Sequence, residues 1–127
     1  MLMRTFLSCL VIALLISAGA TAQSKQKELR HVVMFGWKAN TPADSVNRVV
    51  TAFKALPAQI KLIKRFEWGV NNSPENLNHG LTHCFLLTFA SEKDRDDYLV
   101  HPAHKAFTQL LPGILDKVTV LDYWAQQ

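Results

Sequence analysis

The stretch "LRHVVMFGWK", residues 29–38, decides the fold because both of its alternating faces are largely apolar. One face carries His31, Val33, Phe35 and Trp37, and the other carries Val32, Met34 and Gly36. A strand with two apolar faces is typical of the middle of a sheet, where both faces are covered. Residues 81–90, "LTHCFLLTFA", repeat the pattern, with His83, Phe85, Leu87 and Phe89 opposed to Cys84 and Leu86. We therefore expect two central strands.

A helix is expected between these two strands. Within positions 41–57, apolar side chains recur at helical spacing: Val46, Val49, Val50 and Phe53. Thr41 is predicted to cap the helix with Pro42 at its first position, and Leu56-Pro57 is predicted to end it. A strand should follow, because Phe66, Trp68 and Val70 alternate with polar residues.

The second half of the chain predicts a loop, a broken helix and a last strand. Residues 71–80, "NNSPENLNHG", have the composition of a loop. Ser91 with Asp94 three residues later is typical of a helix N-cap, and Pro102 should interrupt that helix and open a second one. Residues 117–124, "KVTVLDYW", form the last strand.

The element order is therefore β-α-β-β-α-β, which predicts an α+β fold of the ferredoxin-like type. We expect the first and third strands to be its central pair and to run parallel, so that His31 and His83, each near the start of its strand, lie side by side. Both helices should cover one face of the sheet. The apolar residues of the other face need a cover, and a second copy of the chain is the simplest one, which predicts a homodimer.

The first 22 residues have the order of a secretory signal peptide: Arg4, an apolar run from Phe6 to Ile16, and small residues ending at Ala22. Cleavage near Ala22 would give an exported protein, periplasmic or extracellular, with no membrane anchor. Residues 23–28 are expected to be a flexible lead-in and residues 29–127 the domain. Cleavage would also remove Cys9 and leave Cys84 without an intrachain disulfide partner.

Charge argues against nucleic acid as a partner. The formal net charge is +4, and the loss of Arg4 would lower it to +3. The basic residues are scattered, and the nearest approach to a cluster is Lys61, Lys64 and Arg65. Nucleic-acid binding is therefore disfavoured.

Three stretches together resemble one known family. "LRHVVMFGWK", "THCFLLTF" and "YLVHPAHKAF" are similar to the stress-responsive α/β-barrel family (Dabb, dimeric α/β barrel) over about residues 29–124. The resemblance implies a ferredoxin-like subunit that dimerises through its sheet and encloses a cavity. The family includes plant stress proteins without a settled catalytic role and a plant polyketide cyclase that performs an aldol condensation.

The resemblance to the cyclase also implies candidate catalytic residues. His31 and His83 match its strand histidines, Tyr98 matches its helix tyrosine, and His104 matches the second histidine of its HPxH element, the general base. A histidine titrates near neutral pH and suits acid–base work, and a tyrosine can donate its O–H to an enolate oxygen. In the structural alternative, His101 caps the resumed helix and His104 makes a local hydrogen bond.

These residues leave two functions open. The first is binding of a small, partly apolar organic ligand in the dimer cavity, with cofactor-independent cyclase-, lyase- or isomerase-like proton transfer if the protein is an enzyme. The second is a non-catalytic, stress-associated binding or assembly module with structural histidines, which a cavity filled by Phe35, Trp37 and Phe85 would favour. A metal site built on His101 and His104 is disfavoured, because Pro102 separates them and no cysteine or carboxylate stands at a ligand spacing. No cofactor is expected.

Overall fold

The computed structural model describes residues 27–126, so the predicted signal peptide lies outside the described residues. The elements are β1 (Leu29–Trp37), α1 (Ala43–Gln59), β2 (Arg65–Val70), β3 (His83–Phe89), α2 (Glu92–Val100), α3 (Pro102–Thr108) and β4 (Leu115–Trp124). The predicted element order is confirmed, with the second helical region divided into α2 and α3. Between residues 27 and 126, no helix is long and apolar enough to cross a membrane.

The four strands form one sheet in the order β2-β3-β1-β4, with β1 and β3 in the centre as predicted. All neighbouring strands are antiparallel. The expectation that β1 and β3 run parallel is wrong. The helical crossover makes β1 parallel to β2, and β3 enters between these two strands in the opposite direction.

The direction of β3 separates two of the candidate histidines. His31 pairs with Leu87, whereas His83 pairs with Phe35, four residues further along β1. At about 3.3 Å per residue, the two histidines stand roughly 13 Å apart along the sheet. The prediction that they lie side by side is therefore wrong.

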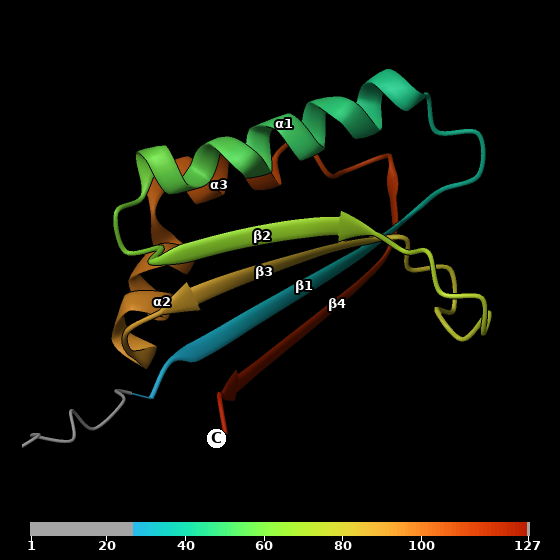
Figure 1. Ribbon diagram of the computed structural model, residues 1–127. Coiled ribbons are helices and arrows are strands. Elements are labelled where there is room, and N and C mark those ends of the chain that lie inside the picture. The colour runs from blue at the N-terminus through green and yellow to red at the C-terminus, as the bar shows by residue number, and fades with distance from the viewer. Residues whose placement is uncertain (1–26, 127) are drawn as a thin grey trace, which may run out of the picture.

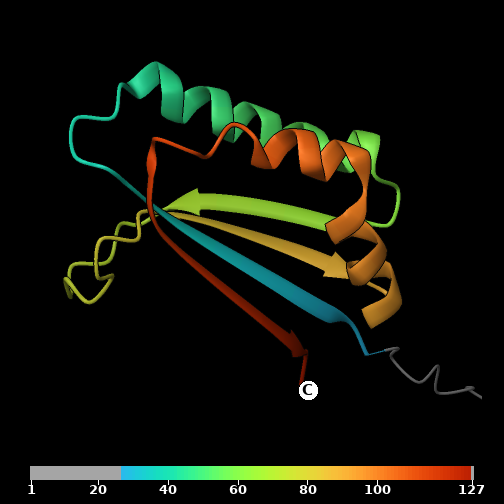
Figure 2. The same ribbon diagram turned by 180° about the vertical axis from the view of Figure 1, so that it is seen from behind.

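All three helices cover one face of the sheet and leave the other open (Figure 1). Helix α1 lies along the sheet, α2 lies at the end where β1 begins, and the 71–82 loop projects from the opposite end. Seen from behind, the same two layers are visible (Figure 2). The core lies between them and centres on Phe53 of α1, whose ring stacks on Phe85 of β3 at a centroid distance of 4.2 Å.

Two details of α1 differ from the prediction. The N-cap is Pro42 and not Thr41, whose hydroxyl instead donates to the carbonyl of Lys38 at 2.8 Å. The helix also continues past Pro57 to Gln59. A proline in the last turn removes one backbone donor, and packing of Leu56 and Ile60 in the core keeps the turn helical.

The predicted start and division of the second helical region are confirmed. The Ser91 hydroxyl accepts from the backbone N–H of Asp94 at 3.0 Å, which caps α2. Helix α2 ends before His101, and Pro102 is the first residue of α3. The extended backbone at His101 changes the chain direction and brings Tyr98 of α2 and His104 of α3 together.

The open face of the sheet carries a group of apolar side chains. We call this group the open sheet face: Val32, Met34, Leu86, Leu121 and Tyr123. Leu121 is 57% exposed and Tyr123 is 44% exposed in the single subunit. Cys84 belongs to the same face and is exposed. A monomer would leave this apolar surface in water, which a covering partner avoids.

Candidate functional site

Three of the four predicted site residues meet on the helix-covered side of the sheet. Tyr98 is fully buried, and its ring centroid lies 4.5 Å from that of His104 and 5.8 Å from that of His31. We call these three residues the Tyr98 cluster. It lies within one subunit, between β1 and the α2–α3 corner, and not on the open sheet face.

The local bond of His104 fixes which ring nitrogen is available. Nδ1 lies 3.0 Å from the carbonyl oxygen of Leu99, and a carbonyl can only accept, so Nδ1 carries the proton. In the neutral ring, Nε2 then keeps its lone pair. The pKa of His104 is lowered, mainly by burial and to a smaller extent by the nearby His31 and His101. The hydrogen bond to the Leu99 carbonyl raises the pKa but does not offset this effect. The neutral ring is a competent base at Nε2.

The hydroxyl of Tyr98 is buried and has no hydrogen-bond partner among the described residues. Burial raises the pKa of Tyr98 well above its ordinary value of 10.0, so the phenol stays protonated near neutral pH. An unpartnered buried hydroxyl costs about 1–3 kcal/mol. The group is therefore an O–H donor beside the His104 ring that has no acceptor among residues 27–126.

His31 is held by the carboxylate of Asp122, a residue that was not among the predicted site residues. Its Nδ1 donates to Oδ1 of Asp122 on β4 at 2.5 Å, and the other Asp122 oxygen accepts from Arg95 of α2. His31 is 4% exposed. Because the carboxylate accepts from Nδ1, Nε2 is the nitrogen left for other partners.

Sequence carried a partial signal for Asp122. It is the one charged residue in the largely apolar segment "VTVLDYW", residues 118–124, and it alternates with residues of the open face. Its pairing with His31 depends on the register between β1 and β4, which are far apart in the sequence. That register could not be read from the pattern of either strand.

His83 is not part of the Tyr98 cluster. It lies at the loop end of the sheet, where the indole N–H of Trp37 donates to its Nδ1 at 3.0 Å. Because Nδ1 is already an acceptor, the Thr82 hydroxyl at 2.9 Å must also donate to it. Burial lowers the pKa of His83. The residue also lines a hollow of about 470 Å³ beneath the 71–82 loop, which is apart from the other candidates.

Aromatic rings fill the interior between His83 and the Tyr98 cluster. Phe35 lies 5.5 Å from both Trp37 and Phe85, and it lies 6.1 Å from Phe53, measured between ring centroids. Phe35 and Phe85 are buried almost completely. Of these rings, Phe35, Trp37 and Phe85 are the three whose packing in the interior favours the non-catalytic function.

The structural alternative for the HPxH histidines is also present. His101 Nδ1 accepts from the backbone N–H of Ala103 at 3.1 Å and so caps α3. Both histidines therefore make the predicted local bonds, although the His104 bond leaves Nε2 free. Within residues 27–126, no group of three His, Cys, Asp or Glu side chains is arranged to hold a metal ion.

Comparison with known proteins agrees with this fold. The family model described as "Stress responsive A/B Barrel Domain" matches residues 29–125. Stress-response A/B barrel domain-containing protein HS1 of Arabidopsis thaliana is 36% identical over 95 residues, 75% of this chain and 87% of that protein. Olivetolic acid cyclase of Cannabis sativa is 25% identical over 95 residues, 75% of this chain and 94% of that protein.

Two solved structures illustrate the shared fold and its assembly. Hydroxynitrile lyase from Passiflora edulis has a TM-score of 0.75 at 22% identity and covers 81% of this chain and 97% of its own. A dimeric protein of ferredoxin-like fold from Bacteroides fragilis has a TM-score of 0.64 at 25% identity and covers 77% of this chain and 96% of its own. Dimeric relatives support a homodimer for this chain as well. The chain belongs to the stress-responsive A/B barrel (Dabb) domain family.

Proposed function

We propose that the protein binds a small, partly apolar carbonyl compound at the Tyr98 cluster of each subunit and moves a proton on it without a cofactor. The observation that carries this proposal is the buried hydroxyl of Tyr98 beside the His104 ring: within residues 27–126, neither that hydroxyl nor His104 Nε2 makes a hydrogen bond. A base and an O–H donor at one place are the two groups that enolate formation needs.

The proposed step has a defined role for each group. His104 Nε2 takes a proton from the carbon next to the carbonyl, and the electron pair of that C–H bond moves toward the carbonyl oxygen. The Tyr98 hydroxyl donates a hydrogen bond to this oxygen, and the proton then returns from His104 to carbon or to a later product. The enolate can add to a second carbonyl group, lose a leaving group or be protonated elsewhere, which are the cyclase, lyase and isomerase outcomes.

His31 is proposed as a positioning residue. Asp122 holds it by Nδ1, so its ring keeps one orientation 5.8 Å from Tyr98. A curated relative at 25% identity is a cyclase by name, which supports the chemistry but not a shared substrate. The separation of His83 from the cluster argues against a role for His83 in the same step.

Ligand binding can be tested with small β-diketones and phenols by thermal shift and by NMR of the histidine ring protons. We expect the wild-type protein to be stabilised, Tyr98→Phe and His104→Gln to lose this effect, and His79→Gln, on the exposed loop, to keep it. Equal stabilisation of all four proteins would place the ligand elsewhere and contradict the proposal.

A second candidate function is a non-catalytic binding or assembly module. It is favoured by the packed rings of Phe35, Phe53 and Phe85 and by the local bonds of His101 and His104. The two functions differ in one measurable respect. If His104 is structural, His104→Gln lowers the free energy of unfolding and changes no ligand response, because the wild type has none.

Assembly and export complete the proposal. We infer that two copies pack through the open sheet face, which accounts for its exposed apolar side chains. We also propose export after cleavage near Ala22, on the strength of the signal-like order of residues 1–22. Mass spectrometry of the protein from a secretory host would show a chain that begins at Gln23, whereas an intact Met1 on the secreted or retained protein would contradict cleavage.

A further inference from the structure

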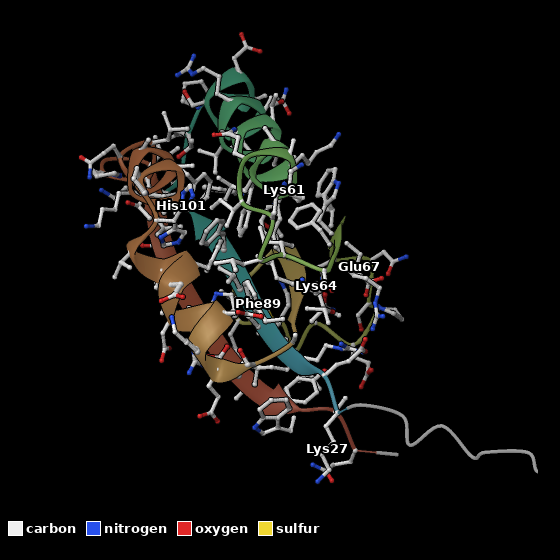
Figure 3. The ribbon with its side chains drawn as sticks, turned by 90° about the vertical axis from the view of Figure 1, so that its left-hand side faces the viewer. Lys27, Lys61, Lys64, Glu67, Phe89 and His101 are labelled. Carbon is white, nitrogen blue, oxygen red and sulfur yellow. The ribbon has the colours of Figure 1, made fainter. Side chains whose placement is uncertain are left out.

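A strongly basic hollow lies at the end of the sheet where β1 begins. It measures about 690 Å³, and its lining includes Lys27, Arg30, Lys64 and Arg65. Glu28 is the single acid in this lining, so the formal charge of the hollow is +3. Figure 3 looks onto this end of the sheet and labels Lys27, Lys64 and Phe89, three of the residues that line the hollow.

The hollow is independent of the Tyr98 cluster. Its Arg30, Thr88 and Arg65 form a row across β1, β3 and β2 on the side of the sheet opposite the helices. All three stand at strand ends, and the remaining lining residues lie at or beyond them. The hollow is therefore at the end of the sheet where β1 begins, on the same side as the open sheet face and next to Tyr123, the β4 partner of Arg30.

The central arginine of the hollow is held in place. Arg30 donates from Nη1 to the Thr88 hydroxyl at 2.9 Å and from Nη2 to Glu28 at 3.0 Å, and its side chain is 18% exposed. A guanidinium has five N–H donors, so these two bonds leave three for another acceptor. Arg65 also donates to Glu28, through the same carboxylate oxygen.

One carboxylate thus neutralises four cations only in part. The hydrogen bond between Glu28 and Arg65 lowers the pKa of Glu28 and raises the pKa of Arg65. A fork of guanidinium donors with two flanking ammonium groups suits a dianion with several acceptor oxygens better than a single carboxylate. A volume of about 690 Å³ lies within the usual range for small-molecule sites.

We propose that the hollow bounded by Arg30, Lys64, Arg65 and Thr88 binds the phosphate group of a small molecule. Arg30 provides the fixed fork, Arg65 and Lys64 provide further positive charge, and Glu28 is an internal acid that competes with the ligand for both guanidinium groups. Phe89, Ala90 and Ala125 form apolar walls beside the charged groups.

The test is the thermal stability and the NMR arginine signals of the purified protein, titrated with inorganic phosphate against sodium chloride at matched ionic strength. Phosphate should stabilise the wild type more than chloride does, and it should shift the Arg30 side-chain signals. Arg65→Gln should weaken phosphate binding roughly tenfold, because one charge-assisted hydrogen bond is lost. Arg65 is 59% exposed, so this variant should fold.

Two further variants separate a site from general charge attraction. Glu28→Gln should tighten phosphate binding, because the competing carboxylate is removed. Lys61→Gln removes the charge of an exposed lysine that is outside the lining of the hollow, and it should leave binding unchanged. Equal weakening by Arg65→Gln and Lys61→Gln, or a phosphate effect no larger than that of chloride, would overturn the proposal. Each variant keeps the Tyr98 cluster intact, so the outcome is separate from that of the proton-transfer proposal.

Discussion

The ring of His104 lies 4.5 Å from the ring of Tyr98, centroid to centroid, across the break between α2 and α3. Pro102 creates this contact, because it ends one helix and starts another at a different angle. The contact places a nitrogen base beside a phenol that has no partner among the described side chains. The stretch "YLVHPAH" is therefore both a structural corner and the centre of the candidate site.

The hydroxyl of Tyr98 should not contribute to stability. Tyr98→Phe removes an unsatisfied polar group and keeps the ring, so the free energy of unfolding should stay the same or rise by up to about 1 kcal/mol. Urea denaturation measures it, with Tyr123→Phe on the open sheet face as the matched control. A loss of more than about 1 kcal/mol in Tyr98→Phe would mean that the hydroxyl has a strong partner in the folded protein.

Acid should destabilise the fold through His104. Its folded pKa is lowered from 6.5, so the unfolded chain binds the proton more readily. The free energy of unfolding is then highest above about pH 6.5 and falls as the pH drops from there to the folded pKa. His83 has a lowered pKa for the same reason and should add to the slope.

Urea denaturation between pH 5 and pH 8 checks this dependence. His104→Gln and His83→Gln should each reduce the pH slope, whereas His79→Gln on the exposed loop should retain it. A wild-type protein that is equally stable at pH 5 and pH 8 would show that folding does not lower the pKa values of His104 and His83.

Asp122 should stabilise the fold through His31. Asp122→Asn weakens a charge-assisted hydrogen bond to a buried ring and the ion pair with Arg95, and it should cost about 1–3 kcal/mol of the free energy of unfolding. Asp116→Asn is the control on the same strand, where the residue is exposed. Equal stability of the two variants would show that Asp122 does not stabilise the fold through His31.

A charge on the open sheet face should separate the subunits. Leu121→Lys places an ammonium group where we expect the partner, and the variant should be monomeric by light scattering coupled to size exclusion. Leu110→Lys replaces an exposed leucine on the helix side, and it should remain dimeric. A dimeric Leu121→Lys protein would show that another surface joins the subunits.

A close backbone approach fixes the loop end of the sheet. A methyl group on Gly36 would collide with the carbonyl of Gly80, whereas Gly69 on β2 has open space around it. Gly36→Ala should therefore cost about 1–3 kcal/mol of the free energy of unfolding, and Gly69→Ala should change it little. Matched urea denaturation of the two variants measures the difference, and similar stability would mean that the 71–82 loop yields at no cost.

The sequence was most informative where one element carries its own signal. The two-faced apolar pattern of residues 29–37 and 83–89 predicted the central strands, and the Ser91 cap predicted the start of α2. These features depend on alternation and on contacts between residues a few positions apart. For the same reason, the local bonds of His101 and His104 could be anticipated.

The errors concern relations between distant elements. The predicted direction of β3 was wrong, and this error alone led to the prediction that His83 lies beside His31. The Asp122–His31 bond depends on the register of β4 against β1, and the basic hollow joins residues from both ends of the chain to β2 and β3. Such contacts depend on the packing of the whole subunit, so no single stretch carries them.

Proton exchange on a carbonyl probe tests the central claim most directly. The purified protein is incubated with a β-diketone or an aromatic methyl ketone in D₂O, and the loss of the proton signal next to the carbonyl is followed by NMR. We predict exchange faster than buffer in the wild type and in His79→Gln, and a rate lower by about 10²–10⁴-fold in His104→Gln, the usual range for loss of a general base. Exchange in His104→Gln equal to that of the wild type, or no acceleration over buffer by the wild type, would contradict the account.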